Sequence, residues 1–307
     1  MHTLLNELPA LERAAAAGLG SRLVLGACYQ PLGPVAELFP ELAADVRLLP
    51  GDEVEEINRE YRLLVGLGSL AITRGAQQRV RAVAARHAGA AVVGERDHFR
   101  RNHDPVFWLS IKPPGRTCLR QSEVMAHLIA RVSQEYPSAG FILNGTSLPW
   151  DAGSNRNYDG WFSHSLEQAG RFCGQLIEEI LTQLPLPVRA SVRAVSGVSV
   201  CDEIVWGEAA DFYFCHGGTM HNKIAWLHPI PGMIHTPAAL RSVFEHQGSL
   251  VEEGAPCYLV APHLIRETEP EPYTSFGLQR TDVNYDFTAL DDLVRDFLDA
   301  FRDSRAR

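Results

Sequence analysis

The sequence predicts an α/β protein made of two Rossmann-like lobes, the N-terminal one reduced, with an amphipathic helix at the C-terminal end. Apolar runs of strand length alternate with segments of helical periodicity along most of the 307 residues. Several of these runs are continuously apolar, which is typical of parallel strands that helices cover on both faces. A polar and aperiodic stretch at residues 94–105 divides the chain into a shorter and a longer part.

The shorter part, residues 1–100, is predicted to form a small α/β lobe. Pro34 opens one of its helices, and Pro50 closes its second strand. A later helix, rich in alanine and arginine, is expected to end near Gly89, so that the polar stretch after it is a junction between the lobes. The expected strands cover residues 22–28 and 45–50, and the expected helices cover residues 34–42, 52–61 and 77–87.

The longer part, residues 105–285, is predicted to form the second Rossmann-like lobe, and residues 286–307 form the C-terminal helix. Strands that alternate with helices imply right-handed crossovers and a parallel sheet, which binds ligands beyond the carboxyl ends of its strands. The expected strands cover residues 105–111, 139–145, 188–195, 211–216 and 232–235, and the expected helices cover residues 121–136, 163–184, 202–210 and 217–227.

Composition and charge exclude some classes of function. Hydrophobic residues make up 46% and charged residues 21%, which is an ordinary globular balance. The net charge of -9, without a long cluster of lysine and arginine, argues against nucleic acid as the main partner. The N-terminus lacks the pattern of a signal peptide, and no apolar stretch is long enough to span a bilayer, so we expect a cytoplasmic protein with no integral membrane segment.

The six cysteines are far apart, and none has the spacing of a zinc site. We therefore expect reduced, mostly buried thiols. An Asp-x-Asp pair in a suitable loop is also missing, because Asp291 and Asp292 lie on the predicted C-terminal helix. The sequence thus predicts that the protein uses no metal.

The most informative segment is residues 215–222, Cys-His-Gly-Gly-Thr-Met-His-Asn, which follows a predicted strand and opens a helix. Gly217 and Gly218 allow the backbone to approach a ligand closely, and N–H groups at a helix start attract anions. Four side chains of the segment could add hydrogen bonds to phosphate oxygens: His216, Thr219, His221 and Asn222. The simpler interpretation is a tight turn between a strand and a helix, with a histidine that fills space.

The run at residues 211–235 resembles the second-domain signature of glycosyltransferases with the two-lobed GT-B fold. It is similar in style to heptosyltransferases, which have a Gly-x-Met-His turn, and to transferases with a strand, a His-Gly-Ala/Gly turn and a helix containing Asn. Residues 107–117, a following helix and the strand at residues 141–145 resemble the opening of the same lobe. The resemblance covers roughly residues 105 to 240.

The resemblance implies transfer of a sugar from a nucleotide-sugar donor to a saccharide or lipid-linked acceptor, with no cofactor besides the donor itself. Gly217, Gly218 and Thr219 would cradle the donor diphosphate. Lys112 or Arg116 would supply positive charge from the first loop, although both are equally well explained as solvated loop residues. The other donor-binding candidates are Asn144, Glu203, His216 and Asn222, and Glu203 is alternatively a stabilising first-turn residue of its helix.

An inverting transfer needs a general base, which in this fold usually comes from the first lobe. The candidates there are Asp52, Glu53 and Glu56, and the sequence does not choose among them. Asp151, in a long loop after the second strand of the sheet, is a further candidate for the base or for an acceptor contact. An ordinary hydrogen-bonded loop explains Asp151 equally well.

Two other functions fit the same features. One is a nucleotide-sugar epimerase or pyruvyl-type transferase on the same fold. The other is a catalytically silent binding or scaffold module in saccharide synthesis, which the short first lobe suggests. The donor sugar, the acceptor, the stereochemical outcome and any homo-oligomeric state stay open.

Overall fold

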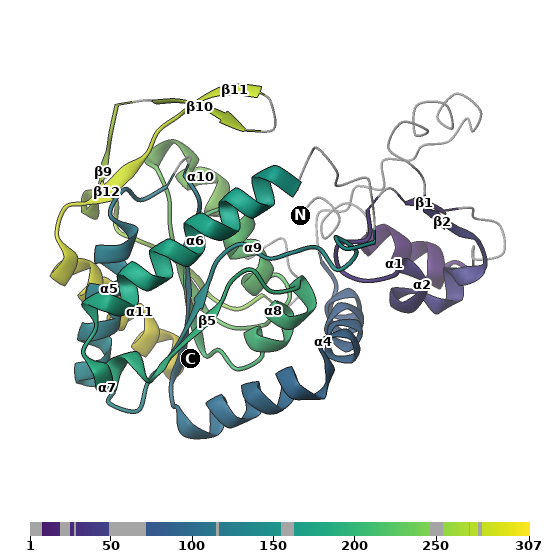
Figure 1. The fold of residues 1–307 in the computed structure, drawn as a ribbon, viewed down its shortest axis with the longest axis horizontal. Helices are drawn as coiled ribbons and strands as arrows, with labels where there is room; N and C mark the ends of the chain where they lie inside the picture. Colours follow the sequence, from purple (N-terminus) through teal and green to yellow (C-terminus); the bar gives the residue numbers. More distant parts are fainter. Residues whose placement is uncertain are drawn as a thin grey trace.

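The structure, a computed structural model, is an α/β fold organised around a six-stranded parallel sheet with the order β5-β4-β3-β6-β7-β8 (Figure 1). It describes residues 8–18, 25–27, 29–48, 72–114, 117–154, 163–245, 254–269, 271–275 and 278–307. The strands are β3 (Val106–Ser110), β4 (Gly140–Asn144), β5 (Val192–Val195), β6 (Phe212–His216), β7 (Gly232–His235) and β8 (Cys257–Leu259). The predicted α/β class and the Rossmann-like parallel sheet are therefore confirmed.

The direction in which successive strands are added to the sheet reverses between β3 and β6. Strands β3, β4 and β5 follow one another toward one edge, and β6, β7 and β8 then continue from β3 toward the other edge. All five neighbouring pairs are parallel, so the carboxyl ends of the strands lie along one edge of the sheet. A ligand site is expected at such a reversal, because the loops that leave β3 and β6 diverge there.

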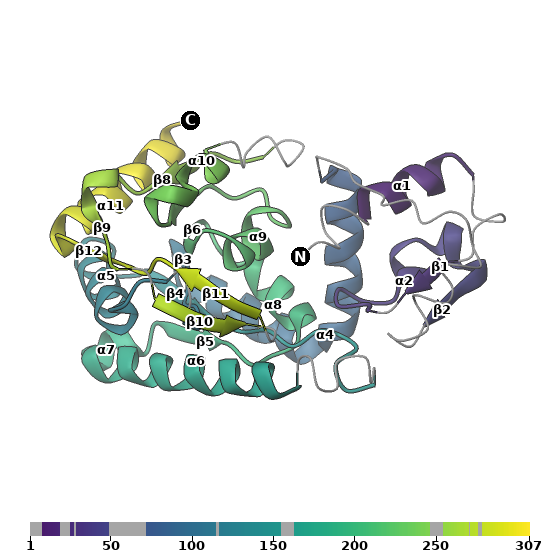
Figure 2. The ribbon, with the colours of Figure 1, turned by 90° about the horizontal axis from the view of Figure 1, so that it is seen from above.

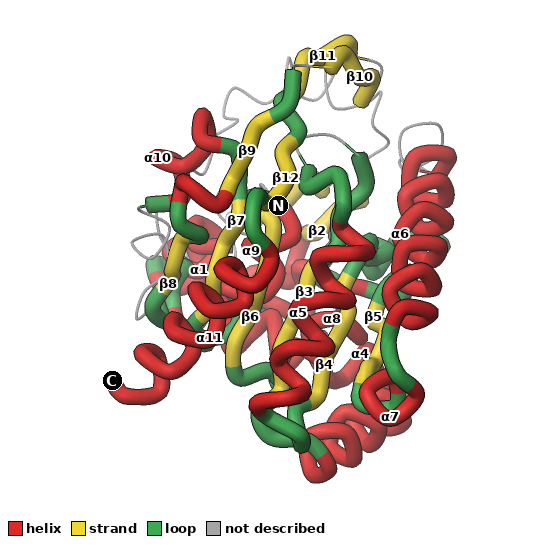
Figure 3. Tube along the Cα trace, turned by 90° about the vertical axis from the view of Figure 1, so that its left-hand side faces the viewer, coloured by secondary structure: helices red, strands yellow, loops and turns green. Residues whose placement is uncertain are grey.

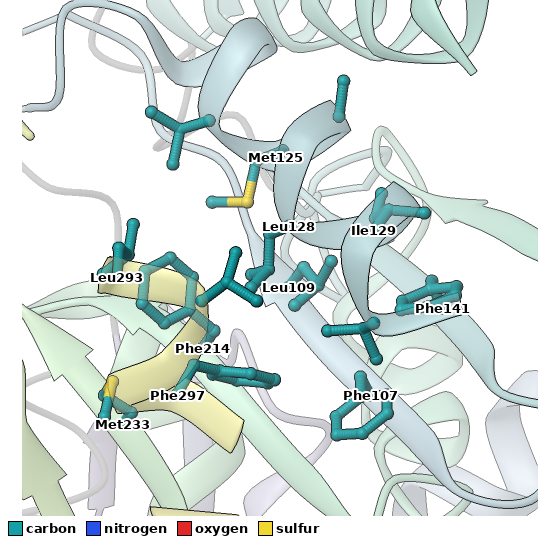
Figure 4. Packing of buried hydrophobic residues seen from close by; sticks show 14 of the residues in the cluster. Phe107, Leu109, Met125, Leu128, Ile129, Phe141, Phe214, Met233, Leu293 and Phe297 are labelled. Carbon is teal, nitrogen blue, oxygen red and sulfur yellow. The ribbon is translucent and has the colours of Figure 1, made fainter. Parts of the chain in front are cut away.

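Helices cover both faces of the sheet (Figure 3). On one face, α5 (Gln121–Glu135), α6 (Ser163–Gln183) and α11 (Leu290–Ala306) pack against the strands. Figure 4 shows Phe107 and Phe214 of the sheet against Leu128 of α5 and Phe297 of α11. The other face carries α8 (Val200–Gly207), α9 (Thr219–Ala225), α10 (Arg241–Phe244) and the second half of α4 (Arg74–Asn102).

Helix α4 corrects the predicted junction between the lobes. Residues 94–102 are helical, because their charged side chains lie on the solvent side and form ion pairs, such as Arg100 with Asp211 at 2.6 Å. The apolar side of the same turns packs on the sheet through Val92 and Phe99. The predicted helix end near Gly89 is confirmed as a break within α4, because Gly89 has the non-helical values φ 77° and ψ 167°; a second helical segment then continues to Asn102.

The described N-terminal elements lie on the far side of α4 from the sheet (Figure 2). They are α1 (Leu8–Ala16), β1 (Leu25–Ala27), α2 (Val35–Leu38), the 3-10 helix Pro40–Asp45 and β2 (Val46–Leu48), with β1 and β2 paired in parallel. Apolar residues of α1, α2 and the 3-10 helix, such as Leu8, Leu38 and Leu42, share one cluster with α4, α8 and Trp226 beside α9. The helix predicted at residues 52–61 lies outside the described residues.

The region after β8 contains strands that the sequence pattern did not predict. Strands β9 (Ile265–Glu267) and β12 (Tyr285–Phe287) pair in antiparallel fashion, and so do β10 (Glu271–Ser275) and β11 (Leu278–Asp282). The C-terminal helix accordingly begins at Leu290 rather than at residue 286. The first half of the strand predicted at 188–195 is also corrected, because Leu186–Arg189 forms the short helix α7.

Candidate functional site

The predicted donor-binding residues that the structure describes lie at the carboxyl edge of the sheet. Lys112 follows β3, Asn144 ends β4, and His216 ends β6 directly before the two glycines. Glu203 lies in the first turn of α8, and Asn222 lies in α9. Arg116, Asp52, Glu53 and Glu56 lie outside the described residues, and Thr219 is described only as the first residue of α9.

The turn after β6 has the backbone geometry that only glycine allows. Gly218 has φ 120° and ψ -140°, and a Cβ atom added there would meet nothing within 4 Å. A Cβ atom on Gly217 would lie 2.6 Å from the ring of Phe244. Gly218 caps α9 without a side-chain hydrogen bond, so no side chain at the cap position competes for the N–H groups of the first turn. The turn thus presents open backbone at the edge of the sheet.

Two of the polar side chains beyond this turn serve packing. His221 is buried, and burial lowers the pKa of its imidazole to about 4, so the ring is neutral. Its Nδ1 lies 2.9 Å from Oδ1 of Asn222, and its ring packs against Tyr213 and Phe244. Asn222 is itself only 8% exposed. The sequence prediction that His221 and Asn222 offer hydrogen bonds to phosphate finds no support in this geometry.

Asn144 and Glu203, 59 residues apart, meet in one buried polar network, which also contains Lys223 of α9. The Nζ atom of Lys223 donates to Oε1 of Glu203 at 2.6 Å, to the carbonyl oxygen of Gly145 at 3.0 Å and to Oγ of Ser147 at 3.2 Å. Asn144 donates through Nδ2 to Glu203 and, at 3.2 Å, to the carbonyl oxygen of Val195. We call these three side chains the Lys223 network.

The Lys223 network uses its donor groups internally, whereas the buried Oε2 of Glu203 has no hydrogen-bond partner among the described residues. An ammonium group has three protons, and all three have a protein acceptor here. Burial raises the pKa of the Glu203 carboxyl, and the Lys223 ammonium opposes that rise. The network therefore fixes the loop after β4 to α8 and α9, next to the glycine turn. Lys223 was not selected from the sequence, although it directly follows Asn222 at the end of the segment that was selected there.

A second polar cluster lies at the ends of β6 and β7 and includes two residues that the sequence analysis did not select. His235, the last residue of β7, is paired with His216 in the sheet, and their rings are 5.7 Å apart. Nδ1 of His235 lies 2.5 Å from the hydroxyl of Tyr285 in β12. Burial, together with a smaller effect of the Lys112 ammonium, lowers the pKa of His235 to about 3.

Asp151 holds the loop after β4 against the N-terminal elements. Its Oδ2 accepts a hydrogen bond of 3.0 Å from the backbone N–H of Gln30, and the N–H of Trp150 donates to the carbonyl oxygen of Pro31 at 2.9 Å. Asp151 is buried, with 3% of its surface exposed. This position supports a structural role, and its predicted role as a base or acceptor contact stays a prediction.

A surface pocket of about 490 Å³ lies away from these residues, between the second half of α4, β5 and α8. Its wall contains an ion pair between Glu95 and Arg193, and the Arg193 guanidinium lies 5.1 Å from the centre of the Trp206 ring. Among the described residues, no group of three or more histidine, cysteine, aspartate or glutamate side chains could hold a metal ion. Within the same residues, no helix has the length and apolarity that crossing a membrane requires.

Comparison with known proteins adds no relative. No protein-family model matches the chain, and a search of curated proteins finds no significant match. The functional proposal below therefore rests on the site itself and on the resemblance of residues 211–235.

Proposed function

We propose that this protein is a glycosyltransferase of the two-lobed GT-B type, which transfers a sugar from a nucleotide-sugar donor to a saccharide or lipid-linked acceptor. The observation that carries the proposal is the meeting of Lys112, the Gly217–Gly218 turn and His235 at the carboxyl ends of three neighbouring strands, β3, β6 and β7. The donor diphosphate suits this place because it is a compact anion. Ligands also bind where the order of the strands reverses, which is between β3 and β6.

The chemistry of the transfer explains why these groups suit it. The leaving group is a nucleoside diphosphate, and its negative charge grows as the glycosidic bond breaks. A nearby lysine ammonium and fixed N–H groups stabilise that charge more in the transition state than in the bound donor, which accelerates the reaction. In this proposal Lys112 supplies the ammonium and the open turn at Gly218 supplies the N–H groups.

The N-terminal elements supply the acceptor side in this proposal. They share an apolar cluster with α8 and with Trp226 beside α9, so they are anchored next to the helices that flank the glycine turn. The general base is proposed to come from this side, with Asp52 and Glu56 as candidates, and it takes the proton of the acceptor hydroxyl. Asp151 lies at the contact between the two parts.

The proposal is tested by ligand binding with a matched pair of glycine variants. Gly218→Ala and Gly89→Ala both place a side chain where the backbone favours glycine, and neither added Cβ meets an atom within 4 Å. Only Gly218 lies at the proposed donor site. A nucleoside diphosphate at about a hundredfold excess over its Kd stabilises the native state by about 2.7 kcal/mol, which a thermal-shift assay detects.

We expect that a nucleoside diphosphate stabilises the wild type and Gly89→Ala but not Gly218→Ala, and that EDTA does not change the shift. Incubation with labelled nucleotide sugars and an acceptor mixture should then give a glycosylated product. The donor site is refuted if no nucleotide stabilises the wild type. Binding without turnover over a broad acceptor set favours the scaffold function instead, and conversion of the donor without any acceptor favours an epimerase.

A further inference from the structure

Two buried polar atoms at the end of β7 have no hydrogen-bond partner within the described part of the chain. They are Nε2 of His235 and Oγ1 of Thr236, in side chains that are each 2% exposed. Leaving a buried polar group unpaired costs about 1–3 kcal/mol, and native proteins rarely do so without a reason. Two such atoms in consecutive residues at a strand end mark a place where a partner is missing.

The contact between His235 and Tyr285 decides which kind of partner Nε2 needs. The Tyr285 hydroxyl lies 2.5 Å from Nδ1 of His235, whereas its other acceptor, the carbonyl oxygen of His235, is 3.5 Å away. We assign the hydroxyl proton to Nδ1, the shorter of the two contacts, which places the proton of the neutral imidazole on Nε2; the opposite tautomer requires the hydroxyl to donate to the carbonyl oxygen at 3.5 Å. Nε2–H is a donor, and the Thr236 hydroxyl can also donate. The missing partner is thus an acceptor.

The surroundings make an anionic acceptor the best match. The backbone N–H of Gly217 donates to the carbonyl oxygen of His235 at 2.9 Å, so the end of β7 lies directly beside the glycine turn. The Lys112 ammonium is close enough to influence His235 electrostatically. Charge-assisted hydrogen bonds to a phosphate oxygen are stronger than those to a neutral group.

We propose that His235 and Thr236 form a phosphate-binding subsite, in which His235 Nε2–H and the Thr236 hydroxyl donate to one phosphate group of the donor diphosphate. The identity of the ligand as a nucleotide-sugar donor rests on the function proposed above, whereas the phosphate chemistry rests on the two donors. Tyr285 is the positioning residue, because its hydroxyl holds the His235 tautomer. Both donor atoms are closed to solvent here, so ligand binding has to open the edge above β7.

Isothermal titration calorimetry on two conservative variants tests the subsite. Thr236→Val keeps the shape of the side chain and removes the hydroxyl, and His235→Phe keeps a ring that can stack on Phe214, which lies 4.5 Å from the His235 ring. The control is His228→Phe, because His228 is equally buried and also has an unpartnered Nε2 in the described residues but lies beyond the end of α9. The probes are UDP, GDP, ADP, CDP, the corresponding nucleosides and inorganic pyrophosphate.

We expect Thr236→Val to weaken the binding of one nucleoside diphosphate and of pyrophosphate about ten- to a hundredfold each, because it removes a hydrogen bond to a charged group. Nucleoside binding and the control variant should be unchanged. Equal binding of a diphosphate by wild type and both variants overturns the subsite and leaves the donor proposal standing. Binding of pyrophosphate without any nucleotide supports the subsite and overturns the donor proposal, and absence of both overturns both. Thr236→Val keeps the test valid if His235→Phe does not fold.

Discussion

The carboxyl edge of the sheet carries two polar clusters that differ in whether their hydrogen-bond donors have acceptors. In the Lys223 network, on the β4 side, the ammonium group has three protein acceptors within 3.2 Å. On the β7 side, His235 and Thr236 each keep a buried donor atom with no partner in the described residues. The Lys223 network leaves only an acceptor unpaired, Oε2 of Glu203, so it has no donor to offer an anion. The unpaired donors on the β7 side, in contrast, cost stability unless an acceptor completes them.

This difference changes the role that we assign to two residues selected from the sequence. Asn144 and Glu203 were predicted to bind the donor, and both lie at the correct edge of the sheet. The Asn144 amide donates to protein acceptors and Oε1 of Glu203 accepts from Lys223, however, so these residues hold the loop after β4 beside the glycine turn. In the proposed site, contacts to the phosphate are therefore assigned to His235 and Thr236 rather than to Asn144 and Glu203.

Acid should destabilise the protein through three buried histidines, one of which, His235, belongs to the β7 side, and this is the largest effect that we predict. The pKa values of His221, His228 and His235 are lowered from 6.5 to about 4, 3 and 3 because the rings are buried. Their stabilising contribution is complete above pH 6.5 and is lost as the pH falls toward the lowered values, because the unfolded state binds the protons first. At pH 5 each buried ring lowers the free energy of unfolding by about 2 kcal/mol relative to neutral pH, so the three rings together lower it by about 6 kcal/mol.

Glu203 acts in the opposite direction, because its raised pKa makes protonation favour the folded state. Urea denaturation at several pH values between 7 and 4.5 measures the sum, and the free energy of unfolding should fall steeply below pH 6.5. Replacing one ring, in His235→Gln, should remove about a third of the slope. A flat profile between pH 6.5 and pH 5 contradicts the assignment of neutral buried rings.

Removing the cation of the Lys223 network should have the next largest effect on the free energy of unfolding. Lys223→Met leaves the Glu203 carboxylate buried without its counter-ion, and breaking a buried pair in this way costs about 3–5 kcal/mol. The free energy of unfolding from urea titration at pH 7 measures the loss. The double variant Lys223→Met with Glu203→Gln should recover most of it, since no charge remains buried. Equal stabilities of the single and double variants show that the pair is not coupled.

Local patterns in the sequence predicted the fold of the second half well, because most strands of the sheet lie in apolar runs. Five of its six strands and the glycine turn follow from such runs. The short strand Cys257–Leu259 and the pair Ile265–Glu267 with Tyr285–Phe287 have only three residues each, too few for a periodic signal. The second half of α4 was missed because its polar side pairs with Glu208 and Asp211, from elements more than a hundred residues away.

The site follows the same division between local and long-range information. The turn at Gly217 and Gly218 was predictable because two glycines directly after an apolar run indicate a tight turn from the local sequence alone. The partners of Glu203 were not, because Asn144 and Lys223 reach it through folding, from 59 and 20 residues away. His235 was overlooked because a histidine at a strand end has no local pattern, and its significance comes from Tyr285, 50 residues further along.

Asp151 lies outside both clusters and offers the smallest predicted effect on stability. Asp151→Asn keeps an oxygen that can accept from the N–H of Gln30, so the free energy of unfolding should change by less than about 1 kcal/mol. Asp151→Ala removes the acceptor from a buried donor and should cost about 1–3 kcal/mol. A purely structural Asp151 predicts that turnover follows stability, with Asp151→Asn close to wild type. Loss of turnover in a stable Asp151→Asn variant would instead make this carboxylate the general base, since an amide cannot take up the acceptor proton.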